Sequence, residues 1–146
     1  MGKKETILNV DIAIMYLEAA FFHYGRKEFV VAIHLAGAAE EILGDIAMEK
    51  TKSNALMERI RKMDSVHNNF GSQVSIDNIM DRLNLYKNKV KHIDIPKDNS
   101  SVTGNFELEA DLMILRAIDN YDTVFGSLPT SDGYYSYLEN GDPIAE

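Results

Sequence analysis

The chain has 146 residues, no Cys, and 15 Lys plus Arg against 23 Asp plus Glu, which gives a formal net charge of −8. This length fits one domain with an ordinary apolar core, and we expect a helical domain over 1–128 and a C-terminal tail over 129–146. The absence of Cys excludes disulfides and cysteine nucleophiles and fits a cytoplasmic location. No apolar run is long enough to cross a membrane, and the acidic total disfavours indiscriminate binding of nucleic acid.

In the first half of the chain, apolar residues recur at the three- and four-residue spacing of amphipathic helices. A first helix is expected over 5–24, ending at Gly25. A second, over 27–50, is apolar on several sides and contains the small-residue run 36–39, so we expect it at the centre of the fold. Gly44 costs this helix up to ~1 kcal/mol relative to Ala, which predicts a kink or a close contact. The seam of the first helix comprises Ile7, Val10, Ile14, Leu17, Phe21 and Tyr24.

The second half of the chain predicts one short and two long helices. The short helix covers 53–63 and gives way to a polar loop. Ser75 is suited to cap a long helix that ends before Pro96, with a seam that includes Ile79, Leu83, Tyr86 and Val90. The last long helix spans about 106–126. Its expected apolar face comprises Leu108, Leu112, Leu115, Ile118, Tyr121 and Phe125.

The tail over 129–146 is rich in aromatic residues. Tyr134, Tyr135 and Tyr137 are expected to dock on their own bundle or on a second chain. No alternating strand pattern of useful length occurs. We therefore predict an all-α protein, an up-and-down four-helix bundle with one additional short helix.

One face of the long helix after Ser75 carries polar residues spaced by four. At about 100° per residue, Asn84, Asn88 and His92 form a stripe roughly opposite the apolar seam. Lys87 and Lys91 flank this stripe. His92 then faces solvent, a cleft or a partner. It either complements the negative C-terminal dipole of a solvated helix end or belongs to a site.

The string Lys87-Asn88-Lys89-Val90-Lys91-His92 resembles the Arg-Asn-x-x-Lys-His form of a motif of the HEPN superfamily. This superfamily comprises helical bundles of bacterial toxin–antitoxin, phage-defence and RNA-processing proteins. Segment 32–44 is similar to its small-residue second helix with an inward acidic residue. Segment 109–121 resembles the closing helix of uncharacterised bacterial HEPN-like proteins. Together these resemblances cover most of 5–126.

In active members of the superfamily this motif cleaves RNA without metal, and two motif helices meet across a dimer. The resemblance implies that His92 takes the proton of the ribose 2′-hydroxyl, which a group with a pKa near ~6.5 can do at neutral pH. Asn88 and Lys91 would orient the phosphate. Lys87 stands where the family has Arg, and lysine cannot make the planar bidentate contact with phosphate. This departure favours a non-catalytic role.

Three residues of the second helix are candidates to support this site. His34 and Glu41 share a face, and Glu40 shares a side with Ile33 and Leu43, so at least one carboxylate is expected to point inward. Two interpretations of Glu40 remain open: it holds a lysine or the imidazole beside His92, or it pairs with a basic side chain to fix helix register.

Other catalytic chemistries find no support in the sequence. A carboxylate-bridged metal bundle requires Glu-x-x-His pairs, and the chain has none; its only analogue, Asp64-x-x-His67, falls in the expected loop. Neither a Gly-x-Ser-x-Gly elbow nor a phosphate-cradling glycine loop occurs. We therefore expect no metal and no cofactor.

The sequence thus predicts a HEPN-like helical protein, a homodimeric interaction or nucleic-acid-associated module of a bacterial defence or toxin–antitoxin-type system. RNA, a nucleotide or another protein are the expected partners, and a membrane is not. The alternative is a metal-independent endoribonuclease with His92 as general base. A regulatory partner that acts only through protein contacts cannot be separated from the first interpretation by sequence.

Overall fold

The computed structural model describes residues 2–69, 75–91 and 100–141, with the side chains of 67–69 excepted. The described part contains seven helices and no strand, which confirms the all-α class. Within it, no helix is both long and apolar enough to cross a membrane. The helices are α1 (Asn9–Gly25), α2 (Phe29–Thr51), α3 (Ala55–Asn69), α4 (Ile76–Leu83), α5 (Leu85–Lys91), α6 (Phe106–Phe125) and α7 (Asp132–Gly141).

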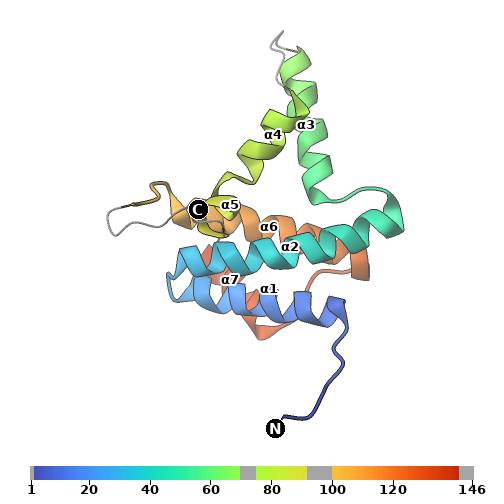
Figure 1. The fold of residues 1–146 in the computed structure, drawn as a ribbon, viewed down its shortest axis with the longest axis vertical. Coiled ribbons are helices and arrows are strands. Elements are labelled where there is room, and N and C mark those ends of the chain that lie inside the picture. Colours follow the sequence, from blue (N-terminus) through green and yellow to red (C-terminus); the bar gives the residue numbers. More distant parts are fainter. Residues whose placement is uncertain (1, 70–74, 92–99, 142–146) are drawn as a thin grey trace.

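The helices divide into two regions (Figure 1). The body consists of α1, α2, α5, α6 and α7, with α2 packed between α1 and α6 and with α7 against α1. The arm consists of α3 and α4, which rise from the body and converge at their far ends. Helix α5 then returns to the body and packs on α2.

Small residues hold α2 at the centre of the body, as the sequence predicted. Alanine and glycine allow neighbouring helix axes to approach closely, and every contact made at such close range adds dispersion energy. The large apolar residues Ile33 and Leu43 fill the space between these small positions, and both are fully buried. The buried small residues of α2 are Ala32, Ala36, Gly37, Ala39, Gly44 and Ala47.

The C-terminal tail forms a helix, α7, that completes the core. Tyr134 and Tyr137 are buried, which confirms docking of these aromatic residues on their own bundle. The ring of Phe21 lies 5.4 Å from that of Tyr137 and 5.8 Å from that of Tyr134. The Tyr137 hydroxyl donates a hydrogen bond to Asp111 of α6. Tyr135, by contrast, is exposed.

The apolar face predicted for the last helix is confirmed for Ile118, which is buried, and for Tyr121, which packs against the core, but it is wrong at three other residues. Leu108, Leu112 and Phe125 are 44 %, 46 % and 42 % exposed, respectively. The prediction followed the leucines and gave no weight to the alanines and polar residues, so it turned the face away from its true position. The buried residues of α6 are Ala110, Asp111, Met113, Ile114, Arg116, Ala117, Ile118, Asn120 and Val124.

Other helix boundaries also differ from the prediction. The helix expected from Ser75 to the approach of Pro96 breaks at Asn84, between α4 and α5. Ser75 does cap α4, since its hydroxyl accepts from the Asn78 amide at 3.2 Å. Helix α3 continues to Asn69, although a loop was expected after residue 63. Helix α1 begins at Asn9, which leaves Ile7 outside it and 49 % exposed.

Candidate functional site

A group of polar side chains lies where α2, α5 and α6 meet, inside the body. We call it the polar cluster: Glu40, Glu41, Lys87, Arg116 and Asn120. Four of the five are buried, at 3 % exposure for Glu40, 5 % for Lys87, 2 % for Arg116 and 0 % for Asn120. Burial of this many polar groups is tolerated only when they satisfy one another.

The Glu40 carboxylate holds two cations at once. Its Oε1 accepts from the Arg116 guanidinium at 2.8 Å, and its Oε2 accepts from the Lys87 ammonium at 3.3 Å. A buried carboxylate without such partners would lose its hydration without any compensating interaction. The expectation that a carboxylate of the second helix points inward is therefore confirmed for Glu40.

Lys87 reaches Glu40 because α2 has a glycine where the lysine side chain crosses it. A Cβ on Gly37 would lie 2.6 Å from Cγ of Lys87 and 2.7 Å from its Cδ, closer than real contacts allow. The Lys87 ammonium also donates to Glu41 at 3.0 Å. Gly37 is therefore the residue that lets a cation from α5 enter the interior.

Glu41 lies at the outer edge of the cluster between two lysines. Lys87 contacts its Oε1 at 3.0 Å, and Lys91 contacts its Oε2 at 3.3 Å. Burial raises the pKa of the Glu41 carboxyl, but the hydrogen bonds and charges of Lys87 and Lys91 outweigh burial, so the pKa lies below its ordinary value of 4.5. Glu41 is therefore ionised at neutral pH and neutralises charge on both lysines.

Arg116 joins the cluster to the end of α4. It donates to the Leu83 carbonyl at 2.8 Å and to Oδ1 of Asn84 at 2.9 Å, in addition to Glu40. A carbonyl at the end of a helix lacks an intrahelical partner, and the guanidinium supplies one. This explains the helix break at Asn84. The Nε of Arg116 is buried and has no hydrogen-bond partner within the described residues.

Asn120, one turn further along α6, joins the cluster to the start of α3. Its Oδ1 accepts from the Ala55 amide at 2.8 Å, and its Nδ2 donates to the Glu40 carbonyl at 3.1 Å. A Cβ on Gly44 would lie 3.1 Å from this Nδ2, so the close contact predicted at Gly44 is confirmed. Both ends of the arm are thus bonded to adjacent turns of α6.

The predicted site residues are only partly brought together. Lys87, Lys91, Glu40 and Glu41 form one bonded group. His92 lies outside the described residues, so its placement stays a prediction. The polar stripe expected from a continuous helix is wrong at one of its ends, because the helix breaks at Asn84, which is half-buried against Arg116.

Two further predicted residues lie at the surface. Asn88 and His34 are exposed, and neither side chain has a hydrogen bond or ion pair within the described residues. His34 precedes the buried Glu40 on α2 but does not join it. The structure therefore gives no contact between these two residues and the polar cluster.

Sequence reasoning missed Arg116 and Asn120. Both were included in the last helix, but neither was given a role. A signal was present: the two polar residues are four apart, and Arg116 interrupts the apolar run of Met113, Ile114, Ala117 and Ile118. A charged residue inside such a run is rarely buried without a partner, so it pointed to an acidic side chain on a neighbouring helix.

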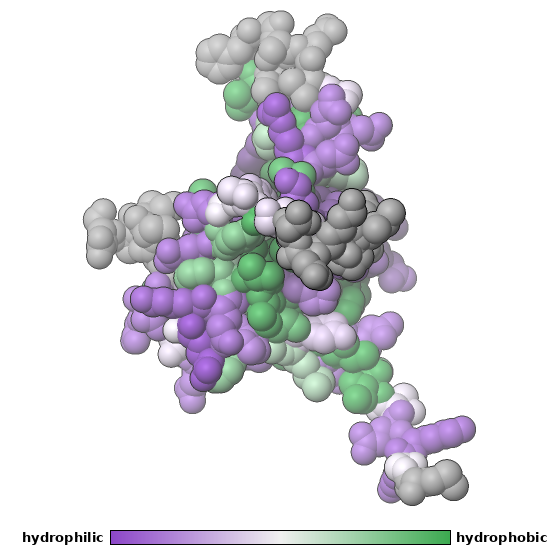
Figure 2. All heavy atoms as spheres, turned by 60° about the vertical axis from the view of Figure 1, so that its left-hand side comes forward, coloured by the Kyte–Doolittle hydropathy of each residue, from purple (hydrophilic) through white to green (hydrophobic). Residues whose placement is uncertain are grey.

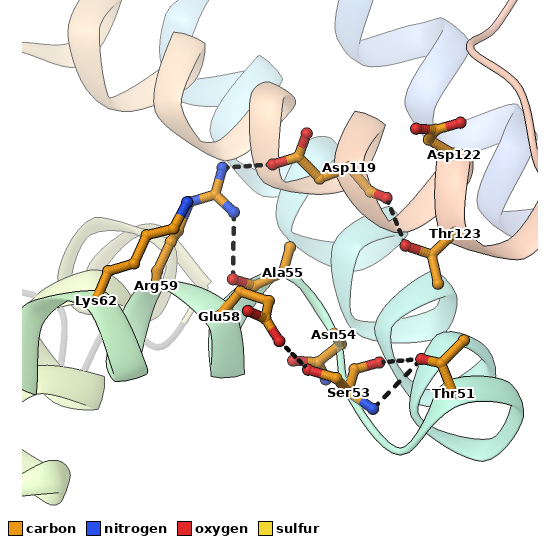
Figure 3. A pocket seen from close by; sticks show the side chains of 10 residues that line it. All are labelled: Thr51, Ser53, Asn54, Ala55, Glu58, Arg59, Lys62, Asp119, Asp122 and Thr123. Carbon is orange, nitrogen blue, oxygen red and sulfur yellow. Dashed lines mark hydrogen bonds and ion pairs between the residues drawn. The ribbon is translucent and has the colours of Figure 1, made fainter. Parts of the chain in front are cut away.

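A second polar site lies outside the cluster, in an open pocket of about 650 Å³ beside the base of the arm. Figure 3 shows Arg59 of α3 reaching across to Asp119 of α6, at 2.8 Å, with Asp122 one turn along the same helix. Ser53 donates to Glu58 at 2.6 Å. The pocket is lined by Thr51, Ser53, Asn54, Ala55, Glu58, Arg59, Lys62, Asp119, Asp122 and Thr123.

No metal site emerges among the described residues, since no three His, Asp or Glu side chains converge there. Asp64 lies in helix α3 rather than in the expected loop, while the side chain of His67 is not among those that the structure describes.

In comparisons with known proteins, the sequence matches no family model, and neither a curated protein nor a solved structure matches it significantly.

Proposed function

We propose that this protein is a non-catalytic interaction module with a HEPN-like up-and-down bundle, which acts as a homodimer and binds another protein. Its setting would be a bacterial defence or toxin–antitoxin-type system, as the sequence resemblance implies. One observation carries the non-catalytic assignment. Lys87, the cation at the arginine position of the motif, is 5 % exposed and paired with both Glu40 and Glu41.

The charge balance of the polar cluster explains why this observation argues against phosphate chemistry. A phosphate stabilised by Lys87 would have to displace a carboxylate at 3.0 Å or 3.3 Å and would meet the remaining negative charge. Lys91 is more accessible, at 38 % side-chain exposure, but it also pairs with Glu41. A site that stabilises developing negative charge needs donors aimed at that charge, whereas these donors are aimed inward at protein carboxylates.

The contacts of the polar cluster support a structural role instead. It joins α2, α5 and α6 and bonds both ends of the arm, through Leu83 and Ala55. A rigid helical body with an attached arm offers exposed helix faces to a protein partner, including the apolar residues Val66 and Ile76 near the far end of the arm. Exposed apolar residues of this kind are typical of protein contact surfaces.

The test is whether Lys91, the more exposed of the two motif lysines Lys87 and Lys91, contributes to RNA binding or cleavage. Purified full-length chain in EDTA is incubated with single-stranded RNA, and binding is measured by fluorescence anisotropy over a salt series. We expect no cleavage. Lys91→Met should change RNA affinity less than about 2-fold and leave its salt dependence unchanged, because only a lysine that contacts phosphate adds to RNA affinity and to its salt dependence. Cleavage that is lost in Lys91→Met would overturn the non-catalytic assignment.

The endoribonuclease is a second candidate, supported by the exposure of Asn88 and Lys91, the two residues that the resemblance assigns to the phosphate. For this candidate, His92→Ala should abolish metal-free cleavage and remove products with 2′,3′-cyclic phosphate ends. Activity that survives His92→Ala would exclude His92 as the general base.

A further inference from the structure

Helix α1 is apolar on two opposite faces. One face is the core face, with Leu17, Phe21 and Tyr24 buried. On the other side Leu8, the N-cap residue, is 64 % exposed, and Met15 and Phe22 are each 60 % exposed. At about 100° per residue, these three residues lie roughly opposite the core face. Ile12 and Ala19, both half-buried, complete this row, which we call the outer stripe: Leu8, Ile12, Met15, Ala19 and Phe22.

The spacing of the outer stripe is that of a helix-pairing seam. Its members are separated alternately by four and three residues, which is the heptad spacing by which one helix packs along another. A helix that needs only one buried face does not require a second seam opposite the first. The stripe extends over roughly 21 Å, the rise of fourteen helical residues. In Figure 2, apolar surface extends from beside the N-terminal segment towards the middle of the face, with hydrophilic surface on both sides.

The two margins of the outer stripe carry different groups. Asp11 and Glu18 border one side. Asp11 is exposed, whereas the half-buried Glu18 carboxylate lies against α7, where a Cβ on Gly133 would be 2.7 Å from its Oε2. Tyr16 and His23 border the other side, and both can donate hydrogen bonds. His23 already contacts Glu28 of its own chain through Nδ1, at 3.2 Å.

We infer that the outer stripe of α1 is a self-association surface, on which α1 of a second copy packs in parallel orientation. When two helices pair in parallel, the residue on one margin meets the residue five positions later on the opposite margin of its partner. The exposed Asp11 then faces the second copy's Tyr16, whose hydroxyl can donate a hydrogen bond to it. Antiparallel pairing instead sets the acidic margins of both copies against each other, and like charges oppose it.

The second copy is favoured over a membrane by charge. The chain carries a net charge of −8, so an anionic lipid surface would repel it, whereas the two margins of the stripe complement each other. One helix per copy makes an interface at the small end of the usual range, and we expect a dissociation constant of roughly micromolar order, the weak end for protein interfaces. This inference rests on the homodimer of the proposed function and assigns its surface.

The first experiment is sedimentation equilibrium of the full chain at a series of concentrations. Met15→Glu should weaken dimerisation at least ~30-fold, because it buries a charge at the centre of the seam. The matched control is Val66→Glu, since Val66 is 53 % exposed but lies on α3. Met15→Ser provides a milder change should the glutamate variant lose its helical circular dichroism, and each variant's thermal melt is compared with that of the wild type.

The second experiment uses the absence of Cys from the chain. Leu8→Cys, Phe22→Cys and, as control, Val66→Cys are treated with a short bismaleimide at low micromolar protein. Parallel pairing places equivalent positions together, so Leu8→Cys and Phe22→Cys should both give covalent dimers and Val66→Cys should not. Antiparallel pairing centred on Met15 would separate both pairs by the length of the stripe.

The outcomes separate the surface from the dimer itself. A dimer that persists in Met15→Glu overturns the surface and leaves the proposed homodimer intact. A chain that is monomeric at 100 times the concentration expected for half-association overturns both. Covalent dimers from neither Leu8→Cys nor Phe22→Cys overturn the parallel arrangement. A monomer whose outer stripe instead binds phosphatidylglycerol vesicles, with binding lost in Met15→Glu, would identify the stripe as a lipid surface.

Discussion

The body and the arm are held by different kinds of interaction. The body has a continuous apolar core in which α1, α2, α6 and α7 all bury large side chains. Among the described residues of the arm, only Ala55, Ile60 and Ile79 are buried, and Val66 and Ile76 near its far end are exposed. Polar bonds from Arg116 and Asn120 attach the arm to the body. Apolar burial therefore holds the body together, whereas directional polar bonds fix the position of the arm.

Arg116 should give the largest effect, because it serves both regions. Arg116→Ala leaves the Glu40 carboxylate buried with Lys87 as its only buried cation and removes the bonds to Leu83 and Asn84. Removing one partner of a buried ion pair lowers the free energy of unfolding by about 3–5 kcal/mol. Urea unfolding followed by circular dichroism measures the loss. The double variant Arg116→Met with Glu40→Leu should lose less stability than Arg116→Ala, because it leaves no unpaired carboxylate at Glu40. A loss below about 1 kcal/mol in Arg116→Ala would contradict the role of Arg116 in joining the two regions.

Asn120 should separate the arm from the body. Asn120→Ala leaves the Ala55 amide without its partner and removes the side-chain bond to the Glu40 carbonyl, which α2 itself still satisfies. An unsatisfied buried group costs about 1–3 kcal/mol. We expect faster amide hydrogen exchange in the first turn of α3 while exchange in α2 changes little. Asn140→Ala is the matched control, since Asn140 is exposed and its side chain donates to the Ser136 carbonyl within α7. Equal acceleration in the arm and in the body would show that the two regions open as one unit.

Gly37 tests the path by which Lys87 enters the body. Alanine favours a helix by up to about 1 kcal/mol over glycine, but its Cβ would meet Lys87 carbons whose ammonium is tethered to two glutamates. We expect Gly37→Ala to lower stability by about 1 kcal/mol, measured by urea unfolding. Gly25→Ala is the control, because its Cβ would meet no atom within 4 Å. A more stable Gly37→Ala would show that Lys87 repacks freely.

Glu41 should give the smallest effect, visible only in the pH dependence of stability. Its pKa is lower in the folded chain than its ordinary value of 4.5, so its ion pairs contribute stability above that pH, and this contribution is lost as the pH falls further. The carboxylate is 46 % exposed, so solvent screening limits its worth to below about 1 kcal/mol. Urea unfolding between pH 3 and pH 7 should show that the free energy of unfolding of Glu41→Gln falls less steeply with acidification than that of the wild type. An equal fall in both proteins would contradict the contribution of Glu41.

The sequence predicted the central helix and its inward acid but could not predict what that acid binds. Glu40 stood out because Ile33 and Leu43 share its side of α2. Its partner Arg116 is 76 positions away along the chain, and no local spacing connects the two. The break at Asn84 was missed for the same reason, since it depends on a guanidinium from α6. The leucine pattern also misplaced part of the buried face of α6, where Leu108 and Leu112 are exposed and Ala110, Ile114 and Ala117 are buried.

By itself, the sequence determined the all-α class, most helix positions and the docking of tail tyrosines, because apolar spacing and capping act within a few residues. Only the tertiary structure decided that Lys87 is an interior cation rather than a surface one, that Arg116 and Asn120 fix the arm, and that α7 completes the body. These outcomes depend on which helices pack together, since a buried charge is stable only where a distant segment supplies its counter-charge. Helix periodicity reports which residues share a face, and packing decides what that face meets.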